Sequence, residues 1–186
     1  GRWPTAGSCR LPAVPFAVKR TSARDGALLG HGTAGPSALG QGIDAAWLQV
    51  LAAIRQAFTA ARIGLPGWHQ CALGAGLSGV SNRPWHDQFV ATDPGFGRLL
   101  VETDAFTTVL GAHQGRPGAV VAAGTGSVGE VLRSDRSRFS VGGWGFPVGD
   151  EGSGAWLGLR AVRLAQCAMD GRINAGTLVH KVWQQC

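Results

Sequence analysis

Apolar residues recur at steps of three and four along residues 43–62. This spacing puts them on one face of an α-helix, which completes a turn every 3.6 residues. Gly64 and Pro66 come directly after the pattern and are typical of a helix end. We therefore predict a helix over 43–62 whose apolar face packs in a core. The residues of this face are Ile43, Trp47, Val50, Leu51, Ile54 and Phe58.

Shorter apolar runs between turn residues predict strands. The runs cover residues 71–77, 99–104 and 119–123. Two further segments, 128–133 and 138–142, predict a hairpin, and Asp25-Gly26 is a second hairpin turn signal. Helical patterns return over 153–169 and again from about residue 175. This mixed order of strands and helices predicts an α/β fold.

The size and composition of the chain are typical of a globular protein. Its 186 residues include 45% apolar residues, which is enough for a core. No apolar run approaches the ~20 residues that span a bilayer, so we expect no membrane association. The four cysteines and five histidines lack the spacing of a metal site. Buried free thiols would fit the reducing cytoplasm, which is the location we expect.

The positive charge of the chain is concentrated near its start. Five basic residues and no acidic residue precede Asp25, and without these five the formal net charge of +6 falls to +1. Nucleic-acid binding requires a basic patch on the folded body, which this pattern does not predict. We therefore expect no nucleic-acid partner. The five are Arg2, Arg10, Lys19, Arg20 and Arg24.

Two glycine-rich turns carry the polar chemistry. The first, Gly124-Thr-Gly-Ser127, follows the apolar run 119–123 and offers backbone N–H groups and two hydroxyls to an anion. The second, residues 142–158, brings Asp150 and Glu151 to the start of a helix, with Ser153 as a candidate N-cap. Each turn also has a purely structural interpretation: the first as an ordinary β-turn, and the second as a tight turn whose Asp150 and Glu151 only stabilise a helix start.

Together these turns resemble one known family. The run Gly142-Gly-Trp-Gly, followed by Gly149-Asp-Glu-Gly-Ser153, is similar to the signature of the BadF/BadG/BcrA/BcrD ATPase family. That family includes N-acetylglucosamine kinases and glucosamine kinases, and it belongs to the sugar kinase/Hsp70/actin superfamily. The resemblance extends from about residue 21 to residue 186. It implies an RNase-H-like, actin-like ATPase fold with two lobes and a central cleft.

The resemblance also implies that both ends of the chain depart from the family. The family opens with a strand that carries Asp-Gly-Gly-Gly-Thr, a phosphate loop that is missing here. We therefore interpret residues 1–20 as an atypical segment that replaces the first strand. Residues 21–115 would form part of the first lobe and residues 116–186 the start of the second. Family members continue further, so the adenosine-binding region is expected to be missing.

Catalytic and phosphate-binding roles follow from the same resemblance. Asp104 would be the catalytic residue, accepting the proton of a sugar hydroxyl as ATP transfers its γ-phosphoryl group. Gly124, Thr125, Gly126 and Ser127 would bind the phosphates, and Mg²⁺ would accompany ATP. From the sequence pattern alone, Asp104 could equally be the N-cap of the helix that follows it.

The resemblance implies a set of sugar-binding residues as well. For three of these, a structural interpretation stays open: Asn82 as a helix cap, Trp144 as a core residue and Glu151 as a complement to a helix dipole. Kinases of N-acetylglucosamine often place an asparagine after the entry loop, whereas Ser37 is followed by Ala38, which leaves the sugar open. The full set is Ser37, Asn82, Gly143, Trp144, Gly145, Asp150 and Glu151.

We predict an ATP-dependent amino-sugar kinase acting on N-acetylglucosamine or glucosamine. Its partners would be a small-molecule sugar and a nucleotide, and a homodimer stays open. One alternative is an inactive or sugar-binding fragment of such a kinase. Another is a BadF/BcrA-type ATPase activator of a reductase, which would need cysteines to hold an iron–sulfur cluster. The scattered cysteines do not favour that alternative.

Overall fold

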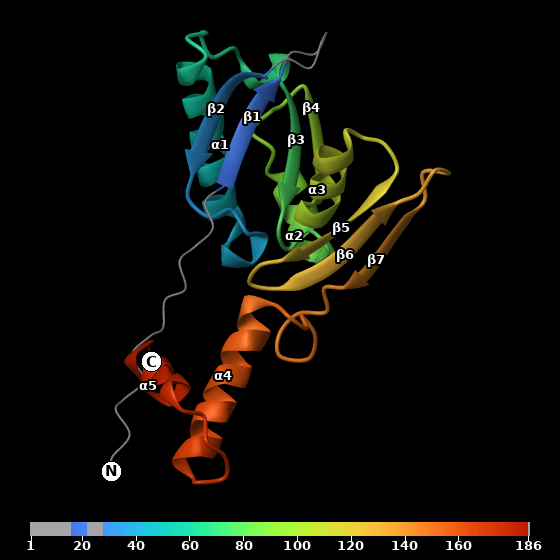
Figure 1. Cartoon of the computed structure of the whole chain (residues 1–186). Coiled ribbons are helices and arrows are strands. Elements are labelled where there is room, and N and C mark those ends of the chain that lie inside the picture. Colours follow the sequence, from blue (N-terminus) through green and yellow to red (C-terminus); the bar gives the residue numbers. More distant parts are fainter. Residues whose placement is uncertain (1–15, 22–27, 186) are drawn as a thin grey trace. The chain divides into compact units, whose positions relative to one another are not determined.

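The computed structural model describes residues 16–21 and 28–185 (Figure 1). They divide into two compact units, which we call the N-terminal unit (residues 16–108) and the C-terminal unit (residues 109–185). The boundary falls inside helix α3 (Asp104–His113), whereas the sequence analysis placed it near residue 115. Each unit is described separately.

The N-terminal unit opens with an antiparallel pair of strands, β1 (Phe16–Thr21) and β2 (Leu28–Ala34). Residues 16–20, the end of the segment that we interpreted as atypical, form most of strand β1. The periodicity of residues 16–20 gave no sign of it, since the strand is defined by its pairing with β2. The predicted turn Asp25-Gly26 lies outside the described residues.

Helix α1 (Ile43–Ala60) lies directly on β2, backbone against backbone. A Cβ atom added to Gly30 would lie 2.2 Å from the Ala57 carbonyl oxygen, and one added to Gly32 would lie 2.1 Å from the Ala53 carbonyl oxygen. Ala53 and Ala57 are fully buried. Glycine on the strand and alanine on the helix therefore allow a contact that no larger side chain permits.

Further apolar residues of α1 share one buried cluster with a parallel pair of strands, β3 (Ala72–Leu77) and β4 (Arg98–Thr103), and with helix α2 (Arg83–Ala91). The Trp47 ring stacks on Phe89 with 4.0 Å between ring centroids. Its indole nitrogen donates to the Phe89 carbonyl oxygen at 3.1 Å. The predicted helix and both predicted strands are confirmed. Short 3-10 turns, η1 (Leu39–Gln41) and η2 (Trp68–Gln70), complete the unit.

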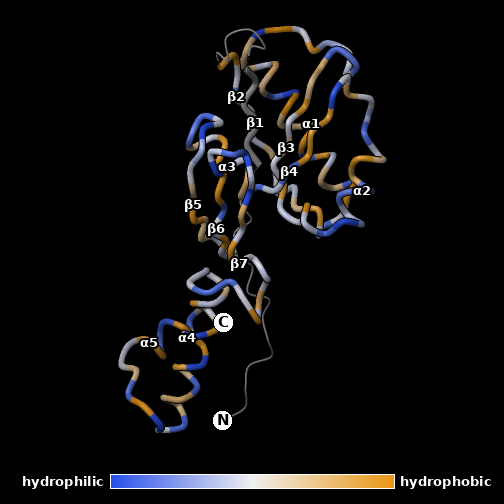
Figure 2. Tube along the Cα trace, turned by 90° about the vertical axis from the view of Figure 1, so that its right-hand side faces the viewer, coloured by the Kyte–Doolittle hydropathy of each residue, from blue (hydrophilic) through white to orange (hydrophobic). Residues whose placement is uncertain are grey.

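The C-terminal unit contains an antiparallel sheet of order β5-β6-β7, followed by two helices. Figure 2 shows the trace of these elements coloured by hydropathy. The predicted hairpin and the predicted helix after Ser153 are confirmed. The elements are β5 (Gly118–Ala123), β6 (Ser127–Leu132), β7 (Arg138–Gly142), α4 (Gly154–Met169) and α5 (Thr177–Gln185). Among the helices of the described residues, none is long and apolar enough to cross a membrane.

Candidate functional site

The two glycine-rich turns meet in the C-terminal unit. The N–H of Gly154 donates to the Gly124 carbonyl oxygen at 2.8 Å, and the N–H of Ala155 donates to the Thr125 carbonyl oxygen at 3.2 Å. The first turn therefore occupies the N–H groups with which α4 begins. Since those groups are already bonded, the start of α4 is not itself an anion-binding end.

Free backbone donors lie instead on the first turn. The N–H of Gly124 donates to the Gly126 carbonyl oxygen at 2.8 Å, which closes the turn tightly. Within the described residues, the N–H groups of Thr125 and Gly126 make no backbone hydrogen bond. Two successive unbonded N–H groups beside an exposed threonine hydroxyl are donors that suit phosphate oxygens.

Ser127 joins the two turns through its side chain. Its hydroxyl donates to the Glu151 carbonyl oxygen at 2.8 Å, and its own carbonyl oxygen accepts the N–H of Gly143 at 2.9 Å. The proton of this hydroxyl is thus used to hold the second turn in place. The Glu151 side chain is exposed and lies two residues before Ser153, whose hydroxyl caps α4 by accepting the Trp156 N–H at 3.1 Å.

Asp150 lies where the two turns come together. A Cβ atom added to Gly126 would lie 2.8 Å from Oδ2 of Asp150, so the carboxylate rests against the glycine backbone. Asp150 is 8% exposed and has a φ of 65°, a left-handed conformation that costs an aspartate about 1 kcal/mol or more. Its carboxylate makes no hydrogen bond or ion pair with the residues that the structure describes.

A buried carboxylate without donors is costly, and such a group is normally bonded to something. Gly126 packs closely against Asp150, and none of the described residues donates a hydrogen bond to its carboxylate. Hydroxyl groups of a ligand would supply the missing donors. We therefore regard Asp150 as the strongest candidate binding residue in the C-terminal unit.

Trp144 is 86% exposed, which contradicts its interpretation as a core residue. It stands between Gly143 and Gly145, whose φ values of 71° and 83° require glycine or a strained residue. The two glycines therefore form a bend that carries the indole ring outward. An exposed aromatic ring in such a loop can stack on an apolar ring face of a ligand.

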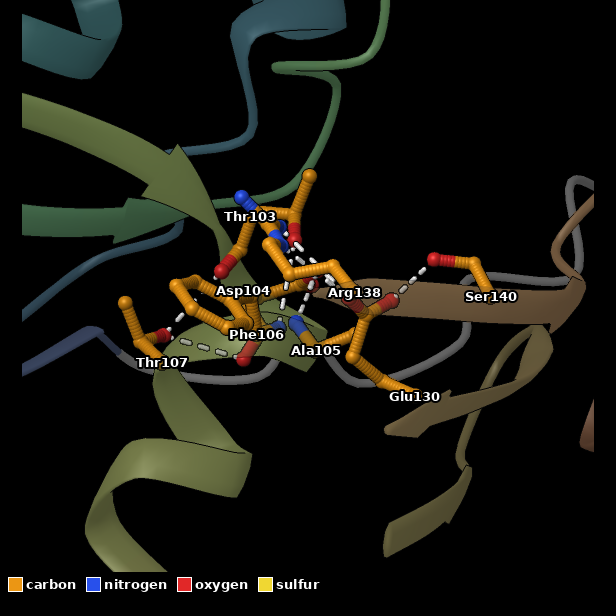
Figure 3. Close-up of polar contacts among 8 residues, drawn as sticks. All are labelled: Thr103, Asp104, Ala105, Phe106, Thr107, Glu130, Arg138 and Ser140. Carbon is orange, nitrogen blue, oxygen red and sulfur yellow. Dashed lines mark hydrogen bonds and ion pairs between the residues drawn. The ribbon is translucent and has the colours of Figure 1, made fainter. Parts of the chain in front are cut away.

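Asp104 is the first residue of α3, and it directly follows β4 (Figure 3). Thr103 supplies the helix-capping acceptor, since its hydroxyl oxygen accepts the Phe106 N–H at 3.1 Å. The Asp104 carboxylate is exposed, and its Oδ1 atom accepts the N–H of the adjacent Ala105 at 2.9 Å. The capping role that the sequence left open for Asp104 is therefore filled by Thr103.

The loop after β3 leaves the same sheet edge as Asp104, because β3 and β4 are parallel and Leu77 pairs with Thr103. Side chains beyond the carboxyl ends of parallel strands often bind ligands. Asn82 lies in that loop, but its Oδ1 atom accepts the Trp85 N–H at 3.2 Å. Asn82 therefore caps α2, as the structural interpretation had it, and a role in sugar binding stays a prediction.

Ser37 belongs to a loop that contacts the one carrying Asn82. The N–H of Leu39 donates to the Ser78 carbonyl oxygen at 3.0 Å, which ties the two loops together. Ser37 is buried, and its hydroxyl makes no side-chain hydrogen bond with the described residues. Asn82 and Asp104 thus follow the carboxyl ends of β3 and β4, and the loop of Ser37 is bonded to the loop after β3. Asn82 caps a helix and Ser37 is buried, whereas Asp104 is exposed.

Glu130 is a buried acid that the sequence analysis missed. It lies in the middle of β6, is 2% exposed, and accepts a hydrogen bond from the Ser140 hydroxyl (Figure 3). Arg138 Nε lies 3.5 Å from Oε1 of the same carboxylate. The signal that could have revealed Glu130 is its alternation with Val128 and Leu132, which places an acid on an otherwise apolar strand face.

No group of three or more metal-ligating side chains lies together in the described part of the chain. Mg²⁺ in kinases is held largely by nucleotide phosphates and water, with one or two carboxylates, so it does not require such a cluster. The unbonded N–H groups of Thr125 and Gly126 can donate hydrogen bonds to the phosphate oxygens of a nucleotide. The residues present are therefore compatible with Mg²⁺ and ATP.

Comparison with known proteins identifies the family. The family model of the BadF/BadG/BcrA/BcrD ATPase family matches residues 16–186. The chain belongs to this family. The match begins five residues earlier than the sequence resemblance indicated, at the first residue of β1.

Two curated relatives are sugar kinases by name. The chain is 34% identical over 149 residues to the glucosamine kinase GspK of Vibrio cholerae, covering 80% of the chain and 50% of the relative. It is 29% identical over 102 residues to an N-acetylmuramic acid/N-acetylglucosamine kinase of Clostridium acetobutylicum, covering 55% of the chain and 33% of the relative. The chain thus spans half or less of the length of these relatives.

Two solved structures share the fold of this family member. A Chromobacterium violaceum protein described as a candidate N-acetylglucosamine kinase is 49% identical with a TM-score of 0.82, over 88% of this chain and 57% of its own. A similarly described protein from Porphyromonas gingivalis is 24% identical with a TM-score of 0.61, over 88% of this chain and 56% of its own. The family member therefore has the α/β, actin-like ATPase fold of these proteins.

Proposed function

We propose that the protein acts in ATP-dependent phosphorylation of an amino sugar, glucosamine or N-acetylglucosamine. The observation that carries the proposal is the buried, unpartnered carboxylate of Asp150 beside two free backbone N–H groups. A carboxylate of this kind suits sugar hydroxyls, and N–H groups of this kind suit phosphates. The names of the relatives support the same substrate class.

Each part of the reaction has a candidate group in this proposal. Thr125 and Gly126 bind phosphate oxygens through their N–H groups, and Asp150 orients the sugar through its hydroxyls. Asp104 accepts the proton of the attacking hydroxyl while the γ-phosphoryl group moves from ATP to that oxygen. Mg²⁺ neutralises charge on the phosphates when it is bound. Trp144 stacks on the sugar ring, and Gly143 and Gly145 hold it outward.

The first test is turnover by the 186-residue chain with Mg²⁺, ATP and each sugar, followed as ADP release. Asp104→Asn is expected to lower kcat by about 100-fold or more, because a general base typically contributes that much. Asp170→Asn, an exposed acid at the end of α4, is the matched control and should leave kcat unchanged. Equal activity of Asp104→Asn and the unmodified chain would refute the catalytic role.

The second test is sugar binding by calorimetry, which does not require turnover. Asp150→Asn is expected to weaken binding by about tenfold, since it loses a charge-assisted hydrogen bond. Gly126→Ala is expected to act similarly because its Cβ atom would displace the Asp150 carboxylate, whereas Gly158→Ala in α4 meets open space and serves as control. Binding without turnover would favour the alternative of a sugar-binding fragment. The absence of both binding and turnover would favour an inactive fragment.

We propose the cytoplasm as the location, which the free thiols of Cys71 and Cys167 support. The four cysteines are scattered along the sequence, a spacing that does not favour the grouped thiols of an iron–sulfur cluster. A reductase activator is therefore less well supported than a sugar kinase. A homodimer stays a prediction.

A further inference from the structure

The first turn of α3, which begins with Asp104, lies directly on strand β3. A Cβ atom added to Gly76 of β3 would lie 2.0 Å from Oγ1 of Thr107 and 2.8 Å from both its Cβ and its Cγ2. The Thr107 side chain therefore occupies the space that a side chain at position 76 would need. Gly74 lies two residues earlier on the same face of β3, and a Cβ atom there would meet nothing within 4 Å. The packing of α3 thus requires glycine at position 76 but not at position 74.

Rotation of the Thr107 side chain would not relieve this overlap. Rotation about χ1 moves the hydroxyl and the methyl group, but it leaves the Cβ atom where the helix backbone holds it. That Cβ atom would lie 2.8 Å from the Cβ atom that Gly76→Ala adds, whereas carbon atoms pack at about 3.5 Å or more. A side chain at position 76 would therefore displace the first turn of α3 itself.

The Thr107 hydroxyl links this contact to Asp104 (Figure 3). It donates to the Asp104 carbonyl oxygen at 3.0 Å, with the Thr103 carbonyl oxygen as a second acceptor at 3.2 Å. The hydroxyl of Thr108 donates to the same Asp104 carbonyl oxygen at 2.7 Å. Two threonine hydroxyls thus hold the backbone from which the Asp104 carboxylate extends. A shift of Thr107 that keeps these bonds would also move Asp104.

We propose that Gly76 and Thr107 are positioning residues that hold the Asp104 carboxylate where it accepts the proton of the sugar hydroxyl. The γ-phosphoryl group of ATP passes to the sugar oxygen in the same step, and ADP leaves. The role of the carboxylate as proton acceptor rests on the proposed function. Its placement matters because a misplacement of about 1 Å can cost about 100-fold in rate. Glycine at position 76 lets α3 begin close to β3, and Thr107 passes that position on to Asp104.

The first experiment measures turnover of glucosamine and N-acetylglucosamine by the 186-residue chain with Mg²⁺ and ATP. Gly76→Ala is expected to lower kcat about tenfold or more and to leave the KM for the sugar nearly unchanged, because the carboxylate acts in the chemical step. Gly74→Ala is the matched control on the same strand face and should leave kcat unchanged. Calorimetric titration with the sugar counts the folded binding sites, so kcat is expressed per site.

The decisive comparison repeats Gly76→Ala in a chain that already carries Asp104→Asn. A positioning effect acts only through the carboxylate, so Gly76→Ala should leave the residual kcat of Asp104→Asn almost unchanged. A general loss of structure would instead lower kcat by the same factor in both backgrounds. Equal factors in the two backgrounds would therefore overturn the proposal.

Substitutions at Thr107 keep the proposal testable if Gly76→Ala does not fold. Thr107→Val keeps the shape of the side chain but removes the hydroxyl, and it is expected to lower kcat about fivefold through the lost hydrogen bond to Asp104. Thr107→Ser keeps the hydroxyl and should recover most of this loss. Equal kcat values for Thr107→Val and the unmodified chain would overturn the proposal.

An NMR measurement separates this proposal from the proposed function, because it does not require turnover. Oδ1 of Asp104 accepts the Ala105 N–H at 2.9 Å, so both groups report where the carboxylate lies. Gly76→Ala and Thr107→Val should shift the signals of the Asp104 carboxyl carbon and the Ala105 N–H, whereas Gly74→Ala should leave both in place. These shifts in a chain without turnover would support the positioning of Asp104 and contradict the proposed function. Unchanged signals in both variants would overturn the positioning, whatever the activity.

Discussion

The two units of the molecule are built in different ways. Of the 18 buried apolar residues in the described part of the chain, 15 lie in the N-terminal unit and three in the C-terminal unit. The N-terminal unit has one continuous core around α1. The C-terminal unit is held together at its turns mainly by hydrogen bonds, such as those from Gly154 and Ser127.

This contrast separates two ways of fixing functional groups. Asp104 stands at the end of a strand in a packed unit, so its backbone is fixed by hydrophobic burial. Asp150 stands in a loop, and its position depends on contacts between one glycine turn and another. We therefore expect hydrophobic packing to determine the position of Asp104, and hydrogen bonds between the two turns to determine the position of Asp150.

The largest expected effect concerns the packing of α1 on β2. Gly32→Ala should destabilise the chain by about 3 kcal/mol, because the new Cβ atom would overlap the Ala53 carbonyl oxygen of a buried helix. Gly74→Ala in β3 is the control, since a Cβ atom there meets open space, and it should change stability by less than about 0.5 kcal/mol. Urea unfolding followed by circular dichroism measures both. Equal stabilities would show that α1 can move away from β2.

A smaller effect is expected at the start of α4. Ser153→Ala should cost about 1 kcal/mol, since it removes the acceptor of the Trp156 N–H. The same unfolding experiment measures it, and Ser134→Ala at the hairpin tip serves as the comparison. If the two units unfold separately, the loss should appear only in the transition of the C-terminal unit. A loss shared by both transitions would contradict the distinction between the units.

The smallest effect is a change of protonation with no change of fold. The hydroxyl and N–H of Ser137 bond to the Asp135 carboxylate and hold its pKa below the ordinary value. Ser137→Ala removes the hydroxyl contribution, so the pKa of Asp135 should rise toward the ordinary value. The bonds from Ser137 stabilise the hairpin tip only while the Asp135 carboxylate is ionised, so their contribution is present above the ordinary pKa and is lost as the pH falls through the lowered pKa. The difference in stability between Ser137→Ala and the unmodified protein should therefore disappear in acid. NMR titration of the Asp135 carboxyl carbon measures the shift, and an unchanged pKa would contradict it.

Elements with strong periodicity could be predicted from the sequence. The stripe that includes Trp47 and Phe58 identified α1, and the apolar runs identified β3, β4 and β5, because burial of one face dictates each pattern. Strand β1 could not be found this way. Its existence depends on pairing with β2, and pairing leaves no mark on the periodicity of the strand itself.

The candidate site was predictable as a set of residues but not as an arrangement. The glycine turns and their acidic residues are visible in the sequence. The contact between Gly126 and Asp150 is not, because it depends on how the hairpin between them folds back. The capping residue of α3 could not be predicted either. Thr103 and Asp104 are both good capping residues, and only the structure shows that the Thr103 hydroxyl accepts the Phe106 N–H. Glu130 escaped notice because a single acid in a strand usually faces solvent.

The bonds from Gly154 and Ala155 to the first glycine turn have one more consequence. They link the start of α4 to that turn, so a shift of the turn that keeps both hydrogen bonds also shifts the helix. A nucleotide that draws the turn toward its phosphates would pull the helix along its axis, and α5, which packs on α4, would travel with it. Nucleotide binding at the first glycine turn would thereby change the position of α5.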